Sequence, residues 1–121
     1  MGKDSTALVP GPGAIYTGVV WSQGLDIVAS PPKQRREVFY SGNVQGVGFR
    51  YTTQRLAARH DVSGYVRNLP DRRVQVVVEG SKSEVRAFLE DVARAMEAYI
   101  RASDVRELDA TGEFDGFDVR F

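Results

Sequence analysis

Apolar residues recur along this chain with two different periods, and the changes of period mark predicted helices and strands. In residues 81–96 they recur at i, i+3, i+4, i+7, i+8 and i+11, which is the strongest helical pattern in the sequence. Ser81 and Glu84 form a capping box at the start of this run, so we expect the helix to begin there. A second run with helical spacing covers residues 49–60 and predicts another helix.

Five further segments are rich in β-branched and aromatic residues and are bounded by turn residues, which is typical of strands. A turn at Leu69-Pro70-Asp71-Arg72 predicts a hairpin between the second and third of them. The order is β-α-β-β-α-β with one terminal strand, a split βαβ arrangement. It predicts the α+β class, an antiparallel sheet with both helices on one face. The predicted strands are residues 38–43, 65–69, 74–79, 100–108 and 114–121.

In residues 1–35 the apolar residues do not recur at a regular spacing. Prolines and glycines at positions 10–13, and prolines at 31 and 32, interrupt regular structure. Because they also break the only apolar stretch, and the start carries little charge, the segment is not a convincing signal peptide. Residues 14–21 are apolar enough for an edge strand, which is the alternative to a leader without regular structure. We therefore predict a flexible leader, residues 1–35, and one folded domain, residues 36–121.

Composition excludes several classes of function. Among 121 residues, 42% are hydrophobic and 26% charged, as in ordinary soluble globular proteins. Sixteen basic and sixteen acidic residues give zero formal net charge, which argues against a general nucleic-acid binder. The sequence has no cysteine and one histidine, His60, which we interpret as a helix-end residue. No apolar run approaches the roughly 18 residues of a membrane span, so we expect a cytoplasmic protein.

A glycine-rich segment, residues 42–50 (Gly-Asn-Val-Gln-Gly-Val-Gly-Phe-Arg), joins the first predicted strand to the first predicted helix. Unpaired N–H groups at the positive end of a helix dipole form an anion site. Arg50 adds a guanidinium that fits two phosphate oxygens. The segment does not end in the Gly-Lys-Ser/Thr of a Walker A loop, and Tyr51 stands where the dinucleotide fingerprint needs its last glycine. A tight turn whose glycines only supply positive φ is the alternative.

The same region is locally basic. Four arginines and a single acid, Asp61, lie between Ser41 and Leu69, and such an excess attracts an anionic substrate. Because carboxylates that could hold magnesium are missing there, we expect a phosphate bound without metal or other cofactor. Asn68 ends the second predicted strand, and its amide can accept from a water while donating to a phosphate oxygen. An amide is no strong base, so the leaving group must need no protonation, as a carboxylate does not.

Residues 42–50 and residues 64–71 (Gly-Tyr-Val-Arg-Asn-Leu-Pro-Asp) together resemble the signature of the acylphosphatase family. The resemblance extends from about Arg36 to Phe121, most of the chain. It implies a ferredoxin-like sandwich and a metal-independent hydrolysis of an acyl phosphate to a carboxylate and inorganic phosphate. Family members usually carry glycine where Arg72 stands.

The resemblance also implies residue roles. The arginine at the position of Arg50 binds the phosphoryl group, and the asparagine at the position of Asn68 orients the attacking water. These two are the predicted catalytic residues, and no metal ligand is predicted. The predicted phosphate-binding residues are the loop and the arginine after it: Gln45, Gly46, Val47, Gly48, Phe49 and Arg50.

Three alternatives belong to other classes. A non-catalytic anion-binding module could use the same fold. An RNA-recognition domain would need exposed aromatic residues on its third strand, and residues 74–78 contain none. Similar domains also begin larger hydrogenase-maturation proteins, but this sequence has no downstream zinc-finger cysteines, which favours a free-standing enzyme. We expect a monomer whose partners are a small acyl phosphate and the phosphate product, and neither nucleic acid nor a membrane. Carbamoyl, glycolytic and aspartyl phosphates all satisfy this chemistry.

Overall fold

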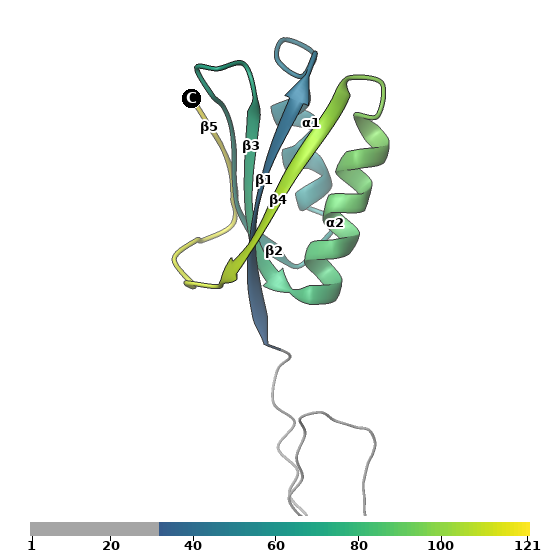
Figure 1. Ribbon diagram of the computed structural model, residues 1–121. Coiled ribbons are helices and arrows are strands. Elements are labelled where there is room, and N and C mark those ends of the chain that lie inside the picture. The colour runs from purple at the N-terminus through teal and green to yellow at the C-terminus, as the bar shows by residue number, and fades with distance from the viewer. Residues whose placement is uncertain (1–31) are drawn as a thin grey trace, which may run out of the picture. The chain divides into compact units, whose positions relative to one another are not determined.

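A computed structural model describes residues 32–121, which form a five-stranded sheet with two helices on one face (Figure 1). The strand order in the sheet is β4-β1-β3-β2-β5. The predicted α+β class, the element order and the ferredoxin-like arrangement are confirmed. Along the chain the elements are β1 (Lys33–Gly42), α1 (Phe49–Ala57), β2 (Val62–Asn68), β3 (Val74–Ser81), α2 (Lys82–Ala95), β4 (Ile100–Asp109) and β5 (Phe117–Arg120).

The first strand is longer than its apolar alternation indicates. Residues 33–35 are polar, yet they pair with Ser81, Gly80 and Glu79 of β3, so β1 begins five residues before the predicted strand. Pairing with a neighbouring strand can extend a strand into residues whose own strand propensity is low. The rest of the predicted leader, including the alternative edge strand at residues 14–21, lies outside the described residues.

The sheet is mixed rather than wholly antiparallel. β1 pairs antiparallel with β3 and β4, and β2 pairs antiparallel with β3, as predicted. β5, however, runs parallel to β2, and it lies at the opposite edge of the sheet from β4. Because β4 and β5 are consecutive in the chain but lie at opposite edges of the sheet, residues 110–116 must pass from one edge to the other.

The core lies between the sheet and the helices. The predicted serine cap is present, because the Ser81 hydroxyl accepts a hydrogen bond from the Glu84 amide at 3.3 Å. The Glu84 carboxylate accepts from the Asp61 amide at 2.9 Å and not from Ser81, so the reciprocal half of the predicted capping box is not formed. Beyond α1, the His60 ring contacts Asp91 of α2 at 2.7 Å, which fits its interpretation as a helix-end residue. The buried apolar side chains on this face include Val38 and Tyr40 of β1, Val74, Val76 and Val78 of β3, and Val85, Phe88 and Val92 of α2.

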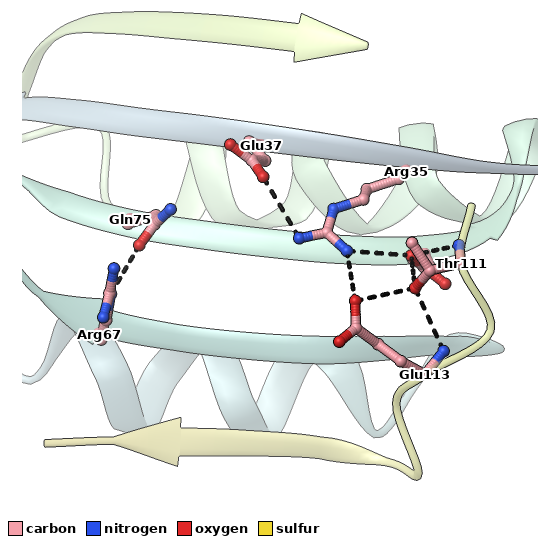
Figure 2. Close-up of polar contacts among 7 residues, drawn as sticks. Arg35, Glu37, Arg67, Gln75, Thr111 and Glu113 are labelled. Atoms are coloured by element: carbon pink, nitrogen blue, oxygen red, sulfur yellow. Dashed lines mark hydrogen bonds and ion pairs between the residues drawn. The ribbon is translucent and has the colours of Figure 1, made fainter. Parts of the chain in front are cut away.

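The other face of the sheet carries a polar network that holds the connection to β5 (Figure 2). Glu79 of β3 is only 3% exposed, and it accepts hydrogen bonds from the Thr111 and Gly112 amides at 2.8 and 2.9 Å and from the Thr111 hydroxyl at 2.9 Å. The Arg35 guanidinium lies 3.4 Å from Glu79 and 2.8 Å from Glu113. A carboxylate on a central strand thus anchors the crossover to the sheet.

Burial by itself raises the pKa of Glu79. The hydrogen bonds from Thr111 and Gly112, together with the nearby Arg35 charge, outweigh that effect. The pKa of Glu79 therefore lies below its ordinary value, and the carboxylate form is the one that the fold stabilises.

Candidate active site

Sheet topology places three chain segments at one end of the domain. β1 and β2 are both antiparallel to β3, and β5 is parallel to β2, so these three strands run in the same direction. Their last residues therefore reach the same end of the sheet, which is also where α1 begins (Figure 1). The glycine loop after β1, Asn68 at the end of β2 and Arg120 at the end of β5 meet there.

The glycine loop keeps its backbone amides available. Gly46 and Gly48 both adopt a φ of 79°, a left-handed conformation that a side chain disfavours. Gly48 is also the N-cap of α1, whose first turn has neither a side-chain cap nor an acidic residue. Within residues 32–121, no protein group accepts a hydrogen bond from the amides of residues 45–48. Such donors at a helix N-terminus can hydrogen-bond to an anion, and we call residues 45–48 with the start of α1 the cradle.

Two apolar side chains fix the loop at its ends. Val44 is fully buried, and Phe49 is 2% exposed, with its ring centroid 5.1 Å from that of Tyr40. Because both side chains belong to the core, the four residues between them are held as a short arch. Val47 is partly buried and packs against the same core. The cradle is thus preorganised by packing and does not depend on a ligand for its shape.

The Gln45 side chain is used for structure. Its Nε2 donates to the carbonyl oxygens of Leu69 at 2.9 Å and Arg73 at 3.0 Å. These carbonyls flank the turn between β2 and β3, so the bonds tie the loop to the residue that follows Asn68. Of the predicted phosphate-binding groups of Gln45, only the backbone amide is left for a ligand.

Arg50 contacts the end of β5. Its Nη1 donates to the Arg120 carbonyl at 3.3 Å, and its Cζ lies 4.6 Å from the ring centroid of Phe121. Arg120 is the register partner of Arg67, the residue before Asn68. Sequence reasoning missed the contribution of Arg120 and Phe121, since only the parallel pairing of β5 with β2 brings them to Arg50.

Asn68 lies between the hydrogen bond from Gln45 to Leu69 and the hydrogen bond from Arg50 to Arg120. It is the last residue of β2, half-buried, and pairs with Val74. Its side chain forms no hydrogen bond with another residue in the described part of the chain. Gln45 bonds the residue after it, and Arg50 bonds the register partner of the residue before it. The structure therefore brings the loop, Arg50 and Asn68 together.

The other arginines of the locally basic region are not all at this site. Arg67 points to the face of the sheet away from the helices, where its Nε donates to Gln75 Oε1 at 2.7 Å (Figure 2). Arg55 and Arg59 are exposed further along α1 and just beyond it. Arg50 is the arginine of this group that lies in the first turn after the loop.

Within residues 32–121, no three or more histidine, aspartate or glutamate side chains gather in a way that could hold a metal ion. None of the helices in residues 32–121 is both long enough and apolar enough to span a bilayer.

This chain is similar to known proteins over most of its length. The family model described as acylphosphatase matches residues 36–119. The acylphosphatase of Syntrophus aciditrophicus is 42% identical over 89 residues, 73% of this chain and 93% of that protein. The acylphosphatase of Archaeoglobus fulgidus is 38% identical over 86 residues, 70% of this chain and 96% of that protein. The crystal structure of acylphosphatase from Bacillus subtilis superposes with a TM-score of 0.66 at 27% identity, covering 73% of this chain and 99% of that one. Because the family model matches residues 36–119 and these relatives share most of its length, the chain belongs to the acylphosphatase family.

Proposed function

We propose that this protein is an acylphosphatase, an enzyme that hydrolyses acyl phosphates to a carboxylate and inorganic phosphate. The observation that carries the proposal is the arch of loop amides that have no acceptor within residues 32–121. Gln45 bonds Leu69, the residue after Asn68, and Arg50 bonds Arg120 of β5, the register partner of Arg67. Family membership supports the reaction, and this geometry supports the roles of the residues.

The loop and Arg50 hold the phosphoryl group. Its oxygens accept hydrogen bonds from the backbone amides of residues 45–49 and from the Arg50 guanidinium. Phosphoryl transfer requires mainly positioning and charge stabilisation, and fixed donors supply both. The Arg120 carbonyl, which takes one of the five guanidinium N–H donors, leaves the others for phosphate oxygens.

Asn68 orients the water. The side-chain oxygen accepts a hydrogen bond from the water, and the amide nitrogen donates to a phosphoryl oxygen. The water oxygen attacks phosphorus, the bond between phosphorus and the acyl oxygen breaks, and its electron pair leaves with the carboxylate. The water proton passes to the phosphate product or to solvent. The leaving carboxylate has a pKa near 4, so no general acid is required.

Turnover of benzoyl phosphate by the purified protein tests the activity. We expect hydrolysis at equal rates with and without EDTA, because the proposed mechanism assigns no step to a metal ion. Inorganic phosphate should inhibit competitively, since the product presents the same oxygens to the same cradle. Rates that fall with EDTA and return with magnesium would contradict the metal-independent mechanism, and phosphate binding without turnover would instead indicate a non-catalytic module.

Arg50→Lys tests the phosphoryl-binding role. Lysine keeps one charge but loses the planar fork, so kcat/KM should fall by roughly 10²-fold and the phosphate Ki should rise. Arg55→Lys, the same substitution five residues further along α1, is the matched control and should change both constants by less than about 2-fold. Equal effects of the two substitutions would show that Arg50 acts only through the general field.

We expect the protein to be a monomer and to be located in the cytoplasm. A single chain provides every group of the proposed site, and the absence of cysteine is compatible with a reducing compartment. Light scattering on the purified protein gives its molar mass and therefore its oligomeric state. Fractionation of the source cells shows in which compartment the protein is located.

A further inference from the structure

A cavity of about 510 Å³ adjoins the glycine loop. Residues 41–45 form one side of it, and Arg72 from the β2–β3 turn and Arg101 from β4 complete the lining. Its volume lies in the range of small-molecule sites, about 300–1,000 Å³. Gln45 lines this cavity and also begins the proposed phosphoryl cradle, so the two sites share a wall.

The cavity is positively charged. Its lining contains two arginines and no carboxylate. Among the described residues, neither Arg72 nor Arg101 forms an ion pair or a side-chain hydrogen bond. Arg73, the neighbour of Arg72, is paired with Asp71 at 2.9 Å, so the local acid is already occupied. Two uncompensated guanidiniums around one cavity favour an anionic ligand.

Backbone geometry holds both arginines at the cavity. The amide of Arg72 donates to the Leu69 carbonyl at 3.1 Å, and Arg72 has a φ of 78°, the only positive value of a non-glycine residue in the described chain. This is the bulge position of a hairpin loop, which usually carries glycine. Gly42 has a φ of 129°, and a Cβ there would lie 2.8 Å from the Arg101 amide. The end of β1 and the start of β4 are therefore in close backbone contact, which places Arg101 beside the loop.

We infer that this cavity receives the acyl part of the substrate, and that Arg72 and Arg101 select acyl groups that carry a carboxylate of their own. The inference rests on the proposed function. With the phosphoryl group in the cradle, the acyl group extends past Gln45 into the cavity. A carboxylate there forms charge-assisted hydrogen bonds with the guanidiniums, whereas an uncharged acyl group gains no such bonds.

Two substrates that differ by one carboxylate test the inference: benzoyl phosphate and 4-carboxybenzoyl phosphate. The para position keeps the added carboxylate from attacking its own acyl carbon. We expect kcat/KM to be about 10-fold higher for 4-carboxybenzoyl phosphate, mainly through a lower KM, at roughly 0.15 M salt, where distant charges are screened. Equal kcat/KM for the two substrates would overturn the inference.

Variants assign the preference to residues. Arg72→Gln and Arg101→Gln should each reduce the ratio of the two kcat/KM values by several-fold, and the double variant should abolish it. Arg72→Gly is a second test at the same position, because glycine readily adopts a φ of 78° and the turn remains favourable. Arg55→Gln removes one exposed charge outside the cavity and should leave the ratio unchanged. A ratio that survives the double variant, or that falls equally in Arg55→Gln, would contradict the selection.

The two proposals fail in different ways. Hydrolysis of benzoyl phosphate without any preference refutes the selective cavity and leaves the proposed function intact. If neither substrate is hydrolysed, the proposed function fails, and calorimetric titration of phenylphosphonate and 4-carboxyphenylphosphonate then decides the inference. Tighter binding of the carboxylated phosphonate by the parent, lost in the double variant, supports the cavity, and equal binding refutes it.

Discussion

At the scale of single residues, Asn68 and the cradle have separable tasks in the proposed mechanism. Asn68→Ala leaves the loop amides and Arg50 in place and removes the group that orients water. We expect kcat to fall by roughly 10²-fold or more, the effect of losing one preorganised hydrogen-bonding group. Phosphate should still inhibit, with a Ki that rises by about 10-fold at most, because one donor to a phosphoryl oxygen is lost while the loop amides and Arg50 remain. The measurements are kcat, KM and phosphate Ki, after circular dichroism has confirmed the fold.

A matched control for that variant is Asn43→Ala, an asparagine of the same loop region that precedes the cradle. Asn43 lines the cavity beside the cradle, but the proposed mechanism gives its side chain no task, and within residues 32–121 only its backbone amide has a partner, the Tyr99 carbonyl at 3.0 Å. Asn43→Ala should therefore retain most of the activity on benzoyl phosphate. If Asn68→Ala hydrolyses benzoyl phosphate like the parent, water is oriented by another group and the proposed role of Asn68 is wrong.

Gln45 is a positioning residue, because its side chain holds the loop against the β2–β3 turn. The effect of replacing it on stability follows from donor and acceptor chemistry. Gln45→Glu replaces a donor to two carbonyls with a carboxylate that repels them, so we expect a loss of about 2 kcal/mol in unfolding free energy. Gln54→Glu on α1 should change stability by about 0.5 kcal/mol at most. Urea denaturation measures both, and equal stability of the two variants would show that the Gln45 bonds do not anchor the loop.

At the scale of elements, the connection from β4 to β5 depends on Glu79. Because the fold lowers the pKa of this carboxyl, its contribution to stability is present above the ordinary value of 4.5 and is lost as the pH falls through the lower folded pKa. Glu79→Gln should cost about 2 kcal/mol near neutral pH, since a neutral amide replaces a charged acceptor. It should also lose less stability than the parent between about pH 6 and pH 3.

The difference between parent and variant is the relevant quantity, because other carboxyls titrate in the same range. The pKa values of Asp71, Asp91 and Glu113 are also lowered, mainly by hydrogen bonds from Arg73, His60 and Arg35 respectively. The contributions of Asp71 and Asp91 cancel when the two proteins are compared, whereas Glu113 shares Arg35 and Thr111 with Glu79, so its change belongs to the same network. Urea midpoints at several pH values provide the measurement, and parallel curves for parent and Glu79→Gln would contradict the role of Glu79. Glu90→Gln, at an exposed position on α2, is the control.

At the scale of the whole molecule, the first strand begins at Lys33, whereas the match to the family model begins at residue 36. Removal of residues 1–31 leaves β1 complete, whereas removal of residues 1–35 also deletes the pairing of residues 33–35 and the Arg35 partner of Glu79. We expect the first truncation to keep the melting temperature and benzoyl phosphate turnover. The second should lower the melting temperature by roughly 10 °C or more, because it leaves a buried carboxylate without its cation.

Calorimetry on the two truncated proteins and the full chain checks this prediction. Loss of cooperative unfolding on removal of residues 1–31 would show that those residues belong to the folded unit. Equal melting temperatures for both truncations would show that the polar start of β1 adds nothing to stability.

The sequence alone determined the features that depend on neighbouring residues. The period of apolar residues located both helices, Ser81 was recognisable as a cap, and the Leu69–Arg72 turn separated β2 from β3. The order of glycines and the arginine after them predicted an anion-binding loop before a helix, and the structure places this segment at the N-terminus of α1. Side-chain period, capping and turn preference act within a few residues, so they can be read from a single chain.

Only the tertiary structure decided what depends on strands that are distant in sequence. The polar start of β1, the parallel direction of β5 and the contact of Arg50 with Arg120 all follow from sheet pairing. The side chain of Gln45 is structural because the β2–β3 turn brings two carbonyls within its reach. The register of strands in a sheet is set by the packing and pairing of the whole domain. It therefore cannot be predicted from the local sequence of residues 42–50 or from that of the C-terminal end of β5.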